Sequence, residues 1–167
     1  LGRLMADRYG IAIAGTHGKT TTSSMVATIL EQAGLSPTIL VGGEIIGLES
    51  NAKNGTGKYL VAEADEYDGS FLQLSPSLGV ITNIDADHLD YYKSMEGVML
   101  AFRRFAQRIA PDGHLVVCAD DENIRTLIKS PALPKLVTYG LNTMADWEAR
   151  NLSPNELGGY NFQAFYH

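Results

Sequence analysis

Three clusters of polar residues carry the chemistry that this sequence could perform. The first joins glycines to one lysine and several threonines, in the order Gly15-Thr16-His17-Gly18-Lys19-Thr20-Thr21-Thr22. The second places four carboxylates within the run Glu63-Ala64-Asp65-Glu66-Tyr67-Asp68. The third sets a histidine among aspartates, in the run Asn83-Ile84-Asp85-Ala86-Asp87-His88-Leu89-Asp90. Ammonium, hydroxyl, carboxylate and imidazole groups are those with which proteins bind phosphates and divalent cations.

The first cluster has the pattern of a phosphate-binding loop. A glycine turn between a buried strand and a helix directs backbone N–H groups and the positive helix end at phosphate oxygens. Lys19 would neutralise the β- and γ-phosphates, and Thr20 would offer a hydroxyl to Mg²⁺. The motif is a variant, because the usual spacing requires a glycine where this chain has Ile13. Rather than a tight turn with an exposed lysine, we predict a nucleotide-phosphate site formed by Gly15, Thr16, His17, Gly18, Lys19, Thr20 and Thr21.

The two acidic clusters supply candidate metal ligands. Glu63 follows a predicted strand, where a carboxylate could bind Mg²⁺ beside the phosphates; the alternative is a solvated acidic loop. His88 lies near Asp87 and Asp90, and a neutral imidazole oriented by a carboxylate is a good metal ligand. The pattern equally permits a structural histidine with one of the aspartates as a helix N-cap. We predict Thr20, Glu63 and His88 as metal ligands.

Short apolar runs alternate with helical patterns, which predicts an α/β fold with a mostly parallel sheet flanked by helices. Strands are predicted at residues 9–14, 38–41, 59–64, 78–84, 114–119 and 135–139. Helices are predicted at residues 1–8, 20–33, 94–110 and 121–129, the second with Met25, Ile29 and Leu30 along one face. Residues 42–58 are rich in Gly and Asn, with a turn signal at Asn54-Gly55. Residues 147–152 and 160–166 predict a C-terminal antiparallel β appendage.

The predicted order of elements brings the three clusters together. They follow the first, third and fourth strands. In open α/β sheets ligands bind at the carboxyl ends of the strands, and parallel strands place those ends at one edge. We therefore expect one site built from all three clusters.

Composition excludes several other classes of protein. The chain has 167 residues, of which 45% are hydrophobic, so it can bury the core of one domain and is not wholly disordered. The net charge of −6 disfavours nucleic-acid binding and anionic membranes, and no apolar stretch is long enough for a transmembrane helix. The single cysteine, Cys118, excludes an intrachain disulfide and is compatible with a reducing cytoplasm.

Together the clusters resemble the central ATP-binding domain of the Mur ligases, which are ATP-dependent amide-forming enzymes of peptidoglycan synthesis. The resemblance rests on residues 15–22, on residues 63–66 with Ser70-Phe71, and on residues 81–90, which occur in order at family-like spacing. It covers nearly the whole chain and implies a P-loop-type ATP-binding domain over residues 1–167. The family's N-terminal nucleotide-binding and C-terminal domains would be absent. We therefore expect an excised fragment that is inactive alone.

Two residues resemble the branch of the family that adds L-alanine to UDP-N-acetylmuramate. His17 is typical of that branch, and Phe102 stands where several other members carry a carbamylated lysine. The branch that recycles murein tripeptide onto the same nucleotide sugar shares the phosphate-loop signature, but residues 70–76 are more similar to the alanine-adding branch. A folylpolyglutamate synthase, and a nucleotide-binding module without ligase chemistry, are further alternatives.

The resemblance also implies a mechanism and its cofactors. A carboxylate of the sugar nucleotide would attack the γ-phosphate of ATP, and the amine of L-alanine would then attack the resulting acyl phosphate. Lys19 would stabilise charge on the transferred group, Thr20 and Glu63 would hold one Mg²⁺, and His88 would help hold a second. Lys19 and His88 are thus the expected catalytic residues. The family works in the bacterial cytoplasm; neither the oligomeric state nor the general base for the amine follows from the sequence.

Overall fold

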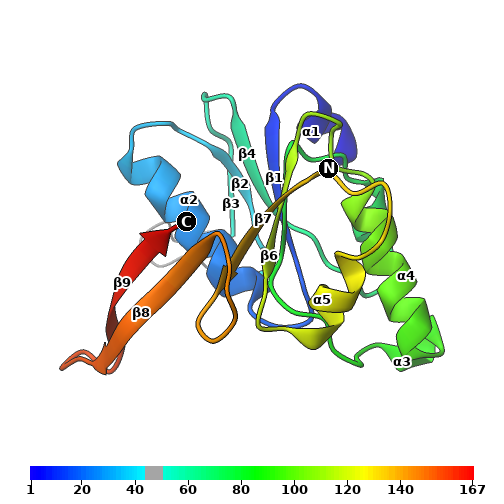
Figure 1. Ribbon diagram of the computed structural model, residues 1–167. Helices are drawn as coiled ribbons and strands as arrows, with labels where there is room; N and C mark the ends of the chain where they lie inside the picture. Colours follow the sequence, from blue (N-terminus) through cyan, green and yellow to red (C-terminus); the bar gives the residue numbers. More distant parts are fainter. Residues whose placement is uncertain (44–50) are drawn as a thin grey trace.

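The computed structural model describes residues 1–43 and 51–167 (Figure 1). Its centre is one sheet with the strand order β3-β2-β4-β1-β5-β6-β7-β8-β9. The strands are β1 (Tyr9–Ala14), β2 (Thr38–Leu40), β3 (Ala52–Lys53), β4 (Tyr59–Glu63), β5 (Leu78–Ile81), β6 (His114–Cys118), β7 (Lys135–Gly140), β8 (Trp147–Pro154) and β9 (Tyr160–Tyr166). The neighbours from β2 to β8 pair in parallel, while β3 and β9 run antiparallel at the two edges.

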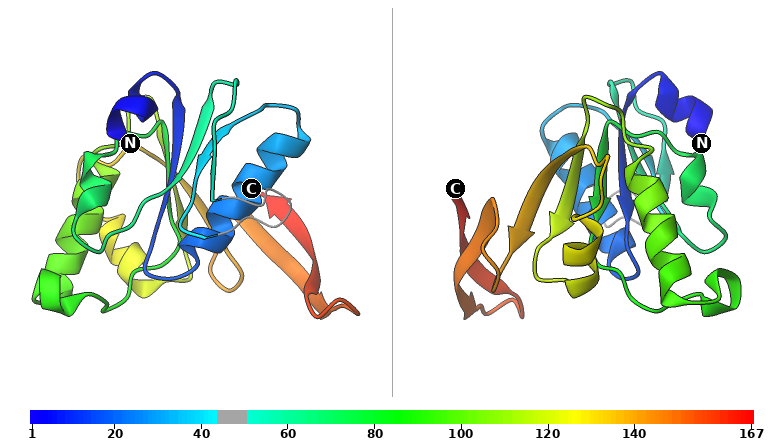
Figure 2. Two further views of the ribbon diagram at one scale, coloured as in Figure 1. Left: turned by 180° about the vertical axis from the view of Figure 1, so that it is seen from behind. Right: turned by 45° about the vertical axis from the view of Figure 1, so that its right-hand side comes forward.

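Helices cover the two faces of the sheet. α2 (Lys19–Gln32) lies on one face, and α4 (Met95–Ala106) and α5 (Glu122–Leu127) lie on the other (Figure 2). The described residues also form α1 (Gly2–Ala6), the 3₁₀-helix η1 (Ser70–Gln73) and α3 (Leu89–Tyr92). The observed architecture confirms the predicted α/β class, the mostly parallel sheet and the C-terminal antiparallel appendage.

The buried strand β1 explains why its sequence is almost continuously apolar. Ala12 and Ala14 belong to the core cluster on the α4 side, whereas Ile11 and Ile13 belong to the cluster on the α2 side. Successive side chains of a strand point to opposite faces, so a strand covered on both faces needs apolar residues at every position. β1 is therefore fixed from both sides, and so is the loop that follows it.

The larger core cluster is centred on aromatic residues. Phe71 of η1 stacks on Phe105 at a centroid distance of 5.2 Å and meets Phe102 edge-on at 5.6 Å. All three side chains are almost fully buried. The N-terminus of α4 is fixed by Ser94, whose hydroxyl accepts a hydrogen bond from the Gly97 N–H. This packing anchors η1 and the acidic segment that precedes it.

The predicted elements are present, with local corrections. The strand predicted to residue 84 ends at Ile81, and the helix predicted to residue 110 ends at Ala106. The Gly- and Asn-rich stretch contains the two-residue strand β3, which its composition did not predict; residues 44–50 of that stretch lie outside the described residues. Cys118 is partly buried and packs against the larger core cluster.

The prediction for α2 is wrong about which side chains share its buried face. Met25 and Ile29 are 61% and 65% exposed, and of the three predicted residues only Leu30 packs on the core. Ser23 and Ala27 are fully buried instead. Small residues at that spacing let the helix approach the sheet closely, which turns the larger apolar side chains outward.

The β8–β9 hairpin projects from the body of the molecule (Figures 1 and 2). Every residue of β9 is exposed, and the pairing of the two strands is interrupted between Arg150 and Ser153. Within the described residues, no helix has the length and apolar character needed to cross a membrane.

Candidate active site

The register of the sheet brings the three polar clusters to one edge. Ile13 pairs with Glu63, and Ala14 pairs with Ile81, so β1, β4 and β5 end at the same level. The loop of residues 15–18, the acidic run and the segment that leads to His88 all begin there. The expected convergence of the clusters is therefore observed.

Two glycines allow the tight connection between β1 and α2. Gly15 and Gly18 adopt positive φ angles of 133° and 81°, in a region that disfavours other residues. A Cβ atom on Gly15 would also lie 2.0 Å from the Thr82 Oγ1 atom. Gly18 is the N-cap of α2, whose first-turn N–H groups have no partner within the helix. The loop thus presents free donors at the positive end of a helix.

The Lys19 ammonium lies at this loop and is held by three groups. Its Nζ atom donates to the carbonyl oxygens of Gly15 at 2.9 Å and Thr16 at 3.3 Å. It also contacts both carboxylate oxygens of Glu66, at 3.1 and 3.0 Å. The side chains of Lys19 and Glu66 are only 14% and 3% exposed. A buried ion pair therefore connects the phosphate loop to the acidic cluster.

Thr20 and Glu63 meet as the sequence predicts. The Thr20 hydroxyl donates to the Glu63 Oε1 atom at 3.1 Å, and the Gly42 N–H donates to Oε2 at 2.8 Å. Glu63 is the last residue of β4, and Thr20 lies in the first turn of α2. A hydroxyl and a carboxylate thus lie side by side next to the free helix end.

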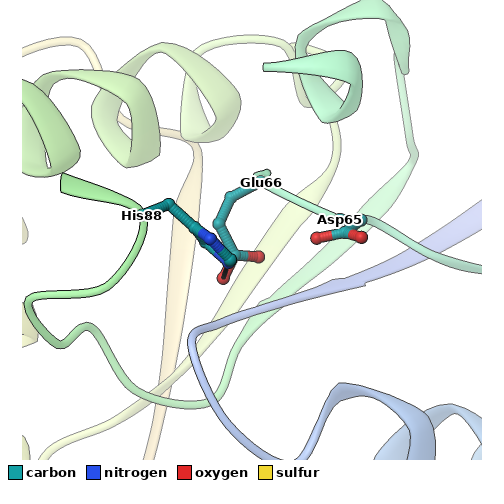
Figure 3. Close-up of side chains that lie close together, drawn as sticks. All are labelled: Asp65, Glu66 and His88. Atoms are coloured by element: carbon teal, nitrogen blue, oxygen red, sulfur yellow. Dashed lines mark ion pairs between the residues drawn. The ribbon is translucent and has the colours of Figure 1, made fainter. Parts of the chain in front are cut away.

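His88 reaches the same site through Glu66. Its Nε2 atom lies 4.0 Å from the Glu66 Oε1 atom. Asp65, Glu66 and His88 offer ligand atoms that all lie within 4.8 Å of one another, and the side chains of Glu66 and His88 point toward each other (Figure 3). His88 itself occupies the N-cap position of α3 with a φ angle of 53°, and neither neighbouring aspartate caps that helix. The Asp87 carboxylate instead accepts the His88 N–H at 2.7 Å.

Glu66 is the residue of this site to which the sequence assigned no role. It is 2% exposed and stands between Lys19 and His88. The Tyr92 hydroxyl donates to the Glu66 backbone carbonyl oxygen. Burial, and secondly the negative charge of Glu66, raises the pKa of Tyr92 to about 12, so this hydroxyl keeps its proton at neutral pH. The acidic run signalled a carboxylate here, but nothing in its pattern distinguished this one from its neighbours.

The donor set fits Mg²⁺. Mg²⁺ prefers hard oxygen ligands and takes one or two carboxylates from a protein, with phosphate and water oxygens completing its shell. The Thr20 hydroxyl with the Glu63 carboxylate forms one such set of oxygens, and the Asp65 and Glu66 carboxylates form a second, with the His88 imidazole nitrogen beside them. The Glu66 Oε2 atom is buried and makes no hydrogen bond beyond its ion-pair contact with the Lys19 ammonium at 3.0 Å.

Comparison with known proteins gives a consistent result. Residues 13–166 match the family model of the Mur ligase middle domain. A UDP-N-acetylmuramate–L-alanine ligase of Syntrophotalea carbinolica is 51% identical over 156 residues, which are 93% of this chain and 34% of that protein. The chain thus spans about a third of the length of this relative.

Solved structures share the fold. The UDP-N-acetylmuramate:L-alanyl-γ-D-glutamyl-meso-diaminopimelate ligase of Neisseria meningitides superposes with a TM-score of 0.84 at 25% identity, over 98% of this chain and 53% of that one. The UDP-N-acetylmuramate–alanine ligase of Thermotoga maritima gives a TM-score of 0.76 at 30% identity, over 91% of this chain and 33% of that one. Since the family model covers all but the first twelve residues and the last, this chain belongs to the Mur ligase family and comprises its middle domain.

Proposed function

We propose that this chain is the ATP-binding middle domain of a ligase that joins L-alanine to UDP-N-acetylmuramate. The observation that carries the proposal is the 51% identity to a relative of that activity, over nearly the whole chain. The site supports it, because an ammonium, free helix amides and two groups of cation ligands meet at one sheet edge. A reaction that consumes ATP also suits the bacterial cytoplasm.

The reaction requires two anions to meet, the sugar carboxylate and the triphosphate of ATP. Attack of the carboxylate on the γ-phosphorus forms an acyl phosphate and releases ADP; attack of the amine of L-alanine then forms the amide and releases phosphate. Catalysis of phosphoryl transfer consists mainly of positioning and charge stabilisation. Lys19 and the first-turn amides of α2 would bind the phosphates and stabilise the charge that develops on the transferred group.

The cation ligands have separate places in this proposal. Thr20 and Glu63 would hold one Mg²⁺, and His88 would help hold a second beside Glu66. Bound Mg²⁺ would supply positive charge that lowers the repulsion between the two anions. Glu66 keeps the Lys19 ammonium at the loop through the ion pair described above, at 3.0 Å.

A second candidate activity is the transfer of a murein tripeptide to the same nucleotide sugar. It is favoured by the structural match of 0.84 to a ligase of that kind. The corresponding sequence identity is only 25%, against 51% for the alanine-adding relative. Fold similarity at such identity reports the shared ligase core rather than the choice of amino acid.

An acceptor screen tests the proposal. The complete ligase that contains this chain is supplied with ATP, Mg²⁺ and UDP-N-acetylmuramate, and phosphate release is measured with L-alanine or with the murein tripeptide. We expect release with L-alanine. Release with the tripeptide alone would establish the second activity, and ATP binding without release in either case would indicate a nucleotide-binding module.

A further inference from the structure

Asn83, on the segment that follows β5, binds the phosphate loop through its side chain, and the proposed reaction gives this residue no role. The Asn83 Oδ1 atom accepts the His17 N–H at 2.8 Å. The Asn83 Nδ2 atom donates to the His17 carbonyl oxygen at 2.9 Å. A carboxamide has one acceptor and one donor side, so it can bind both polar groups of the same backbone residue. This double contact holds His17 in a single backbone orientation.

Further hydrogen bonds join the segment after β5 to Thr16 and again to His17. The Thr16 N–H donates to the Asn83 carbonyl oxygen at 3.1 Å, and the Asp85 N–H donates to the Thr16 hydroxyl at 2.8 Å. The Thr82 hydroxyl donates to the His17 carbonyl oxygen at 2.8 Å. Thr16 is 8% exposed, so its own hydrogen bonds are shielded from water, whereas the hydrogen bonds to His17 lie on the exposed side of the loop.

The hydrogen bonds to Asn83 determine which backbone N–H groups of the loop can still bind a ligand. The N–H groups of Thr16 and His17 already donate to Asn83 and are unavailable to phosphate oxygens. The N–H groups of Lys19, Thr20 and Thr21 lie in the first turn of α2, where a helix offers them no carbonyl partner. The phosphate cradle is therefore the helix end, and its direction depends on how the preceding two residues are held.

We propose that Asn83 is a positioning residue for the polyphosphate of the nucleotide. Its carboxamide fixes the His17 backbone, and through it the left-handed Gly18 that is the N-cap of α2. Without this anchor the loop samples other orientations, and the helix amides must be ordered again each time a nucleotide binds. This inference rests on the proposed function, because it needs a polyphosphate ligand at the loop.

The chain offers a matched control for the test. The Asn123 Nδ2 atom donates to the Ile84 carbonyl oxygen at 2.8 Å, on the same segment but not on the loop. Asn83→Leu and Asn123→Leu therefore remove the same functional group at similar size. In the complete ligase, we expect Asn83→Leu to raise the KM for ATP about tenfold or more, as loss of two hydrogen bonds allows. The KM values for L-alanine and the sugar nucleotide should stay within about twofold, and Asn123→Leu should leave the KM for ATP unchanged.

Amide hydrogen exchange supplies a readout that does not depend on turnover. The His17 N–H should exchange faster in Asn83→Leu than in Asn123→Leu. Asn83→Asp, which keeps the acceptor but loses the donor, should retain protection of this N–H and covers the case in which Asn83→Leu does not fold. Equal ATP KM values in Asn83→Leu and Asn123→Leu, or equal rises for every substrate, would overturn the positioning role. A wild-type ligase that does not bind ATP would overturn the proposed function as well.

Discussion

β1 and β9 belong to the same sheet, yet their surroundings differ completely. β1 has parallel neighbours on both sides and is buried over Gly10–Ala14, whereas β9 has one antiparallel neighbour and is exposed throughout. Apolar residues indicate a strand in both cases. The comparison teaches that an apolar pattern identifies a strand but does not tell whether other elements pack on its faces. The candidate site lies beside the covered strand, where packing on both faces fixes the ends of the chain segments.

Ion pairs show the same difference between the site beside β1 and the exposed hairpin. In the Lys19–Glu66 pair both side chains are largely shielded, at 14% and 3% exposed, whereas in the hairpin pair the Arg150 side chain is 46% exposed and only Glu148 is shielded, at 13%. An exposed pair contributes about 0–1 kcal/mol to stability, since solvent screens it. Removal of one partner from a buried pair leaves an unpaired charge and costs far more. Ionic contacts at the site therefore determine geometry, whereas those on the hairpin contribute little.

The largest expected effect is on stability and compares a core aromatic residue with a hairpin aromatic residue. Phe102→Ala should lower the free energy of unfolding by about 3–5 kcal/mol, because it empties a fully buried position. Phe162→Ala should lower it by about 0.5 kcal/mol, because that ring is 59% exposed. Urea denaturation followed by circular dichroism measures both. Similar losses for the two variants would break the comparison between core and hairpin.

Loss of the loop ammonium should come next. Lys19→Ala should lower the turnover of the complete ligase by a factor of about 10²–10³ or more, the size found for removal of one preorganised donor. Lys53→Ala is the control, since Lys53 pairs with Glu31 at 2.6 Å away from the loop. ADP formation at saturating ATP measures the effect. Near-normal ADP formation by the Lys19 variant would remove the phosphate-loop assignment.

The glycine turn between β1 and α2 could be predicted for a local reason, whereas its role as a phosphate site stays a prediction. Gly15, Gly18 and Lys19 are adjacent in the chain, and their types follow from backbone angles and charge that any such loop requires. The parallel strands predict that Thr20 and Glu63 lie at one edge, and the resemblance to the Mur ligases pairs them; their side chains do meet at 3.1 Å. Their role as Mg²⁺ ligands stays a prediction.

Two features could not be predicted from the sequence, the burial of Glu66 and the buried face of α2, because both depend on tertiary packing. The acidic run contains four carboxylates, and only the folded chain buries Glu66 between Lys19 and His88. Similarly, the helical period of α2 allows more than one apolar face. The choice of the face with Ser23 and Ala27 follows from how closely the helix approaches the sheet. Neither property is encoded in a window of neighbouring residues.

A smaller effect is expected at the histidine of the site. His88→Ala should raise the Mg²⁺ concentration needed for half-maximal turnover by about 10–100-fold, the size seen when support for a metal site is removed. His114→Ala is the control, because His114 begins β6 and does not belong to the three clusters. An Mg²⁺ titration of the complete ligase at fixed ATP measures the shift. An unchanged titration would make His88 a structural residue.

The smallest effect concerns acid stability where the hairpin joins the core. Asp146 precedes β8, and its carboxylate accepts the Thr138 N–H at 2.7 Å and the Thr138 hydroxyl at 2.8 Å. These hydrogen bonds, first the backbone one, lower the pKa of Asp146 below its usual value. A lowered folded-state pKa gives stability that is present above the unfolded pKa of about 3.9 and is lost as the pH falls through the folded value.

Asp146→Asn should remove this dependence, because the amide keeps an acceptor but does not titrate. The difference in free energy of unfolding between wild type and variant should therefore shrink as the pH falls below about 4. It should stay under about 1 kcal/mol, since the group is exposed to solvent. Urea denaturation at a series of pH values measures it. A difference that grows on acidification would mean that the folded-state pKa of Asp146 is raised rather than lowered, which would contradict the stabilising role of the Thr138 hydrogen bonds.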